Sequence, residues 1–200
     1  MSSPPPAQQL AADPAGIPAS GPTDPAADSR GGGRDSAFVA YLLRLRETNA
    51  GARAALRRGE APALSAGALP YLAGWQLHPA ELPAALLFAS ALARHRDIPD
   101  DRSSPLGRAA FQTLSRADRR DPAATGAGRR VVAVQRQSLP MAHRSISGLL
   151  TAIAAAPRVG LDWTGLWRSY RNWEDRDPGR RQQTRQRLLL DFYAAGGAEP

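Results

Sequence analysis

The chain has 200 residues and no cysteine, which excludes a disulfide framework and thiolate metal sites. Its 26 basic residues, all of them arginine, outnumber its 18 acidic residues and give a net charge of +8. No apolar run approaches the ~20 residues that a membrane span requires, and the first residues lack the basic start and apolar core of a signal peptide. We therefore expect a cytoplasmic protein without a membrane segment, whose basic surface favours an anionic partner such as nucleic acid.

Residues 1–35 are expected to form a disordered tail. They hold 7 of the 18 prolines, and their only sizeable apolar side chains are Leu10 and Ile17, so they cannot bury enough surface to offset the entropy of ordering. Two arginines and four aspartates give this segment a net charge of −2, which leaves +10 for the remainder. A GC-rich genome would explain why arginine replaces lysine, but not the excess of arginine over acids.

Residues 36–120 are expected to form an N-terminal helical lobe. Apolar side chains recur at helical spacing over residues 38–45, which predicts an amphipathic helix. Asn49 can cap a second helix, which ends before Gly59 as helices commonly do.

The rest of this lobe is expected to hold three further helical pieces. The first, over residues 69–77, is interrupted by proline and glycine, whereas the leucine and alanine stripe over 81–95 predicts a strong helix. An exposed linker rich in aspartate and proline then leads to a helix over 104–117.

A glycine-bearing loop at residues 121–128 is the expected hinge between two lobes, with a C-terminal helical lobe over 129–195. The valines at 131–134 are also consistent with a short strand, because periodicity cannot decide so short a run. The apolar spacing over 146–153 predicts another helix. The fold class is therefore all-α, with two packed helical lobes that form a helical bundle after the tail.

An aromatic helical hairpin over residues 162–193 completes the predicted C-terminal lobe. Asp162 can cap its first helix, and Asp177 followed by Pro178 is a typical start for its second. The large apolar residues of the first helix share one face: Trp163, Leu166, Trp167, Tyr170 and Trp173. We expect this face to form the inner side of the hairpin, with arginines on the outer side.

The sequence lacks a catalytic constellation. His78, His95 and His143 are far apart, and none has a histidine or carboxylate at the spacing of a metal site. Asp97, Asp100 and Asp101 form a loose acidic cluster without the pattern of a calcium loop. We expect no enzymatic activity, no metal and no cofactor.

Arginines gather in clusters that suit a nucleic-acid backbone. One lies at residues 53–58, one at 116–120 and one at 129–144. The guanidinium fork matches phosphate oxygens, and groups spread over several helices suit a groove that follows a backbone without reading bases. A solvated face is the alternative, as is stabilisation of helix ends by cations. Tryptophans could stack on bases, but the helical phasing of Trp163 and Trp167 favours core packing.

The residues resemble those of CasB, the small subunit of the type I-E CRISPR interference complex Cascade. The resemblance rests on GARAALRRG near residue 55, on the helix with apolar spacing at 82–93 and on the C-terminal pattern LDW, YRNW and DFY. It covers residues 36–195 in order and leaves the proline-rich tail outside.

The resemblance implies a wholly helical, non-catalytic subunit that is present in two copies beside other Cascade proteins. It implies contacts with the backbones of guide RNA and target DNA that stabilise the displaced strand in antiviral defence. We assign these contacts to nine arginines: Arg53, Arg57, Arg58, Arg119, Arg120, Arg129, Arg130, Arg136 and Arg144.

Two other hypotheses remain open from the sequence. A helix-turn-helix transcription regulator would read one duplex sequence through the major groove, although we find no compact unit of that kind with a polar recognition helix. A helical adaptor between proteins would bind no nucleic acid at all.

Overall fold

A computed structural model describes the backbone of residues 25–197 and the side chains from residue 32 onward. Within this range the regular elements are all helices, and β-type pairing is limited to an isolated bridge between Asp100 and Leu161. The prediction of an all-α fold is confirmed. In the part of the chain that the structure describes, none of the helices could span a membrane.

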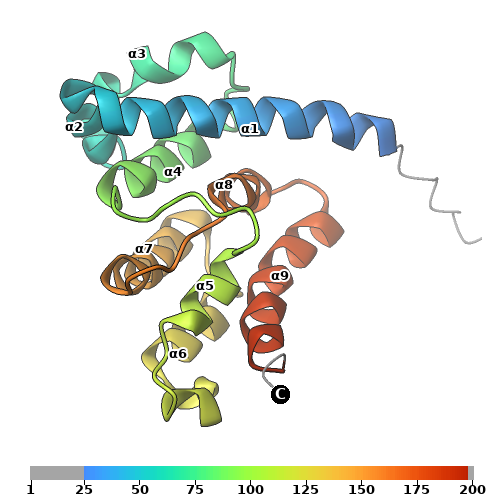
Figure 1. Ribbon diagram of the computed structural model, residues 1–200. Helices are drawn as coiled ribbons and strands as arrows, with labels where there is room; N and C mark the ends of the chain where they lie inside the picture. The colour runs from blue at the N-terminus through green and yellow to red at the C-terminus, as the bar shows by residue number, and fades with distance from the viewer. Residues whose placement is uncertain (1–24, 198–200) are drawn as a thin grey trace, which may run out of the picture.

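The helices form two groups with α8 between them (Figure 1). The upper group contains α1 (Pro25–Thr48), α2 (Ala50–Arg58), α3 (Leu69–Leu72) and α4 (Leu82–Arg94). The lower group contains α5 (Leu106–Gln112), α6 (Gly126–Val134), α7 (Leu139–Ala155) and α9 (Pro178–Gly197). Between them lies α8 (Trp163–Asn172), and short 3-10 turns η1 (Pro62–Gly67), η2 (Ala73–Trp75), η3 (Asp118–Arg120) and η4 (Pro122–Ala124) join several helices.

The first helix begins earlier than the sequence suggests. The expected tail covers residues 1–35, of which 1–24 lie outside the described residues, whereas α1 already starts at Pro25. Asp35, the last residue of the expected tail, is instead part of the folded structure: its side chain is buried and accepts a hydrogen bond from the indole Nε1 of Trp167 at 2.9 Å. Arg171 also pairs with Asp35 at 2.7 Å. This contact joins positions more than 130 residues apart, so local composition could not indicate it.

The local helix signals of the upper group are confirmed. The side chain of Asn49 caps α2 by accepting a hydrogen bond from the backbone N–H of Ala52 at 2.8 Å, and α2 ends at Gly59. The helix α4 covers most of the predicted range 81–95, and its alanine and leucine face is buried. The interrupted piece at 69–77 consists of α3 followed by η2.

The expected boundary at residues 121–128 does not separate the two groups of helices. That stretch forms η4 and the first turn of α6, where the hydroxyl of Thr125 caps the helix and Gly128 packs against the backbone of Pro122. The helix α5, expected in the N-terminal lobe, packs instead on α9 in the lower group. The valines at 131–134 belong to α6, which excludes the strand alternative.

The two helices of the expected hairpin, α8 and α9, face different neighbours. The five large apolar residues of the predicted face, four in α8 and Trp173 directly after it, are buried as predicted, but Trp167 packs on Phe38 of α1 and Phe88 of α4. Phe192 of α9 packs on Phe111 of α5 instead. The aromatic side of α8 therefore packs on the upper group and, through Tyr170, on His143 of α7, and does not pair with the aromatic side of α9.

A continuous hydrophobic core connects the upper and lower groups. Phe88 lies at its centre and contacts Trp163, Trp167 and Tyr170 with ring centroids 5.4–6.3 Å apart. Because burial of each aromatic ring removes a large apolar area from water, this central contact is a main source of stability.

Candidate nucleic-acid interface

The C-terminal end of α2 presents the first group of predicted arginines. Arg57 and Arg58 are exposed, and Arg58 borders a shallow hollow of about 290 Å³ against η1. Arg53 is half-buried, and its guanidinium donates to the backbone oxygen of Arg46 at 3.0 Å. Of these three side chains, Arg57 and Arg58 are therefore available to a ligand, and Arg53 mainly joins α1 to α2.

The second group lies where α6 packs on α7. Arg129 and Arg130 line a hollow of about 350 Å³ together with Ser145. The side chain of Arg130 crosses α7 at Gly148, where its Nε lies 3.1 Å from the position that a Cβ would occupy. Arg144 is exposed directly before Ser145 on the same helix. Two guanidinium groups beside one hydroxyl can contact successive phosphate oxygens.

The other predicted arginines behave differently from one another. Arg119 is half-buried, with its guanidinium 5.5 Å from the ring centroid of Phe111 and its Nε donating to the backbone oxygen of Leu114 at 3.3 Å. It stabilises the chain after α5 more than it offers a surface charge. Arg120 on η3 and Arg136 after α6 are exposed.

A partly buried polar cluster connects the two arginine groups across the molecule. His143 of α7 lies 2.9 Å from the hydroxyl of Tyr170 through Nδ1 and 2.9 Å from the carboxylate of Glu60 through Nε2. Arg94 of α4 pairs with the same carboxylate. The hydroxyl of Ser90 and the guanidinium of Arg94 both donate to the backbone oxygen of Arg57, at 3.0 and 3.3 Å.

The hydrogen-bond partners of His143 determine which of its ring nitrogens carries the proton. An ionised carboxylate only accepts hydrogen bonds, so Nε2–H of His143 donates to Glu60, and Nδ1 accepts from Tyr170. This arrangement satisfies the neutral imidazole. Burial, together with the positive charges of Arg94 and Arg144, lowers the pKa of His143 from 6.5 to about 4. Burial also raises the pKa of Tyr170.

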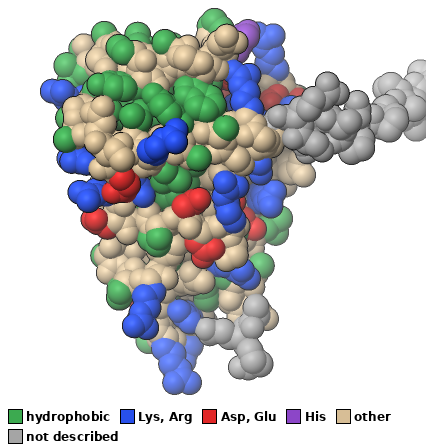
Figure 2. Space-filling model, turned by 45° about the horizontal axis from the view of Figure 1, so that its top comes forward, with side chains coloured by type: hydrophobic (Ala, Val, Ile, Leu, Met, Phe, Trp, Pro, Cys, Tyr) green, Lys and Arg blue, Asp and Glu red, His purple; other side chains and the backbone are tan. Residues whose placement is uncertain are grey.

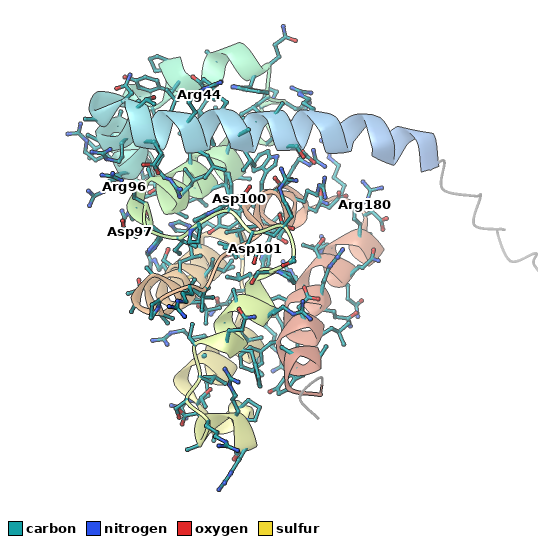
Figure 3. All side chains as sticks on the ribbon, viewed as in Figure 1. Arg44, Arg96, Asp97, Asp100, Asp101 and Arg180 are labelled. Atoms are coloured by element: carbon teal, nitrogen blue, oxygen red, sulfur yellow. The ribbon has the colours of Figure 1, made fainter. Side chains whose placement is uncertain are left out.

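The acidic linker between α4 and α5 has a structural role. Figure 3 shows Asp97, Asp100 and Asp101 where this linker crosses in front of the molecule. The carboxylate of Asp100 accepts from the backbone N–H of Trp163 at 3.3 Å, and Asp101 N–H donates to the backbone oxygen of Leu161 at 2.9 Å. Across residues 32–197, no group of histidines and carboxylates is suited to hold a metal ion.

The surface carries its positive charge widely. Figure 2 shows arginine side chains from the upper to the lower end of one face, with carboxylates between them at mid-height. Trp163 and Trp167 are buried, which confirms core packing for them and leaves no face for a base. Arg44, which is exposed on α1, was not among the arginines predicted from the sequence. The hydrogen bond between Glu60 and His143 was also not predicted, because residues 83 positions apart leave no local signal.

Comparison with known proteins identifies the family. The model of the family described as CRISPR-associated protein Cse2 (CRISPR_cse2) matches residues 52–193, well over half of the chain. The chain belongs to the Cse2 family. The matched region runs from α2 to α9, and so includes both arginine groups and the buried cluster between them. The resemblance to CasB inferred from the sequence is confirmed.

Solved structures of this family have the same fold. A Cse2-family protein of Thermus thermophilus is 21% identical, with a TM-score of 0.62 over 80% of this chain and 97% of that chain. CasB from M. ruber is 20% identical, with a TM-score of 0.59 over 82% and 94%. A chain of a CRISPR RNA-guided surveillance complex is 21% identical, with a TM-score of 0.60 over 83% and 94%. No curated protein matches the chain.

Proposed function

We propose that the chain is the non-catalytic small subunit of a type I-E CRISPR ribonucleoprotein, Cascade. In this role it binds the backbones of guide RNA and target DNA and stabilises the R-loop and the displaced strand during antiviral defence. The observation that carries the proposal is the Cse2 family match over residues 52–193. The fold shared with a chain of a CRISPR RNA-guided surveillance complex supports it.

The charge distribution fits this role. Base pairing with the guide reads the sequence, so a protein subunit needs only to hold backbones and favour a nearly balanced strand exchange. Exposed arginines at α2 and at α6–α7 supply positive charge to phosphates without a recognition helix. The proposed partners are therefore the other Cascade subunits, guide RNA, target DNA and a second copy of this chain.

Affinity purification from the native host tests this assignment. A tagged chain should recover uniform RNAs, each a spacer flanked by repeats, together with several other proteins in fixed proportion. Recovery of random transcripts or of no RNA would count against the Cascade assignment. Selective recovery of one duplex sequence would favour the alternative, a DNA-binding helical transcription regulator.

The α6–α7 arginines give a sharper prediction for the isolated protein. Arg129→Ala with Arg130→Ala should weaken binding to single-stranded DNA about tenfold and reduce the slope of log K against log salt by roughly 1.4, because two phosphate contacts are lost. Fluorescence anisotropy over a range of salt concentrations measures both quantities.

The matched control removes the same charge from α9. Arg180 and Arg187 are exposed and pair with Asp175 and Asp191 at 3.6 and 4.0 Å. The double change of these two arginines to alanine should alter affinity and slope much less. Equal losses in both double variants would mean that the chain binds strands through its net charge alone, and would overturn the assignment of a site at α6–α7.

A further inference from the structure

The partly buried polar cluster described above joins the upper and lower helices around a single histidine. We call it the interlobe latch, and it consists of five residues: Glu60, Ser90, Arg94, His143 and Tyr170. Glu60 follows α2, Ser90 and Arg94 belong to α4, His143 to α7 and Tyr170 to α8. The latch therefore connects four separate parts of the chain.

The latch adjoins an exposed arginine on each side. In the upper group, Ser90 and Arg94 donate to the backbone oxygen of Arg57, which fixes the last turn of α2. In the lower group, His143 directly precedes Arg144 on α7. The hydrogen bond between Glu60 and His143 therefore spans the space between Arg57 and Arg144, beside the hydrophobic core that also joins the two groups.

Polar side chains in this partly buried place reduce the stability of the fold unless each of them forms hydrogen bonds. The side chain of His143 is 6% exposed and that of Glu60 is 27% exposed, so water replaces their mutual hydrogen bond poorly. Hydrophobic contact is not directional, whereas this set of hydrogen bonds is complete in one relative position of the helices.

We infer that the interlobe latch is a positioning element, which holds the arginines of α2 and of α7 at one separation so that a single nucleic-acid strand contacts both groups of helices. This inference rests on the proposed function, and it makes Tyr170, Glu60 and His143 positioning residues that do not touch the strand. Two linked contact sites gain affinity from each other only when their spacing is fixed within the reach of the strand.

Removal of one hydroxyl tests the latch. Tyr170→Phe keeps the buried ring and leaves Nδ1 of His143 without its donor, and Glu60→Gln changes the other side of the imidazole while keeping the shape of the side chain. A second hydroxyl serves as the control: Tyr71 is half-buried and its hydroxyl makes no hydrogen bond in the described part of the chain. Tyr71→Phe should match the parent.

The chain has no cysteine, so two introduced cysteines carry spin labels without background. Ala40 on α1 and Ala154 on α7 are exposed and suit this purpose. Pulsed electron paramagnetic resonance measures the distance between the two labels. It should give one narrow distribution for the parent and for Tyr71→Phe, and a broader one for Tyr170→Phe and Glu60→Gln.

Binding should change with the length of the strand. For a thymidine strand of roughly 30 nucleotides, Tyr170→Phe should lower the affinity about tenfold. A strand of roughly 6 nucleotides reaches only one group of arginines, so the variant and the parent should bind it with the same affinity. A purely structural defect would weaken both strands alike.

The outcomes separate the latch from the proposed function. Unchanged distances and unchanged affinity for the long strand in both latch variants would overturn the inference, as would equal losses on both strands. A parent chain that binds neither strand would overturn the proposed function, and the label distances would still decide whether the latch holds the two groups together.

Discussion

Gly107→Ala should destabilise the protein by about 3 kcal/mol, because the added methyl group has no space between α5 and α9. A Cβ at this position would lie 2.4 Å from the backbone oxygen of Leu188 and 2.6 Å from the backbone nitrogen of Phe192. Both atoms belong to a helix backbone, so neither can move without displacing α9. Thermal unfolding should show a midpoint lowered by roughly 6–12 °C.

The matched control is the same substitution in another helix. Gly33 lies in α1, is exposed and would place its Cβ more than 4 Å from other atoms. Gly33→Ala should stabilise the protein by about 0.5–1 kcal/mol, because alanine favours the helix. If Gly107→Ala matched Gly33→Ala, the close approach of α5 and α9 would be contradicted.

Acidification should remove about 3 kcal/mol of stability through His143 alone. Its pKa is about 4 in the folded chain and 6.5 when exposed, so the unfolded chain gains a proton first as the pH falls. The contribution of neutral His143 to the free energy of unfolding is fully present above pH 6.5 and is lost progressively between pH 6.5 and about 4. Arg94 from α4 and Arg144 from α7 favour the neutral imidazole, and Glu60, whose charge opposes them, is paired with Arg94.

The contribution of His143 can be isolated with one variant. His143→Gln retains a donor and an acceptor but does not titrate in this range. Burial also lowers the pKa of His95, so the parent and the variant will both lose stability on acidification. Urea unfolding at pH 7 and pH 4.5 should give a larger loss for the parent. Parallel pH profiles would contradict a neutral, buried His143.

The local elements of this fold were predictable from the sequence. Asn49, Gly59 and Asp162 act at helix ends through neighbouring backbone groups, so their roles depend on a few adjacent residues. The burial of Trp163 and Trp167 was predictable because helical spacing determines which side chains share a face. Family membership was also predictable, since it rests on these patterns in order.

The partner of each helix face was decided only by the tertiary structure. Apolar spacing indicates that a face is buried but not against which helix, because hydrophobic contact is not directional. The aromatic face of α8 could equally have met α9, yet it packs on Phe38 and Phe88. Gly107 permits the close approach of α9 to α5 by its lack of a side chain, and no pattern around it in the sequence shows this.

Some features of the candidate site were also predictable from the sequence, and others were decided only by the fold. Composition alone determined that the protein is rich in arginine and has an excess of positive charge, and the clusters at α2 and α6 were visible in the sequence. Only the folded chain decided that Arg119 lies over Phe111, that Arg130 remains open beside Ser145 and that His143 meets Glu60. Charge is a sum over residues, whereas the availability of each charge depends on neighbours brought together by distant parts of the chain.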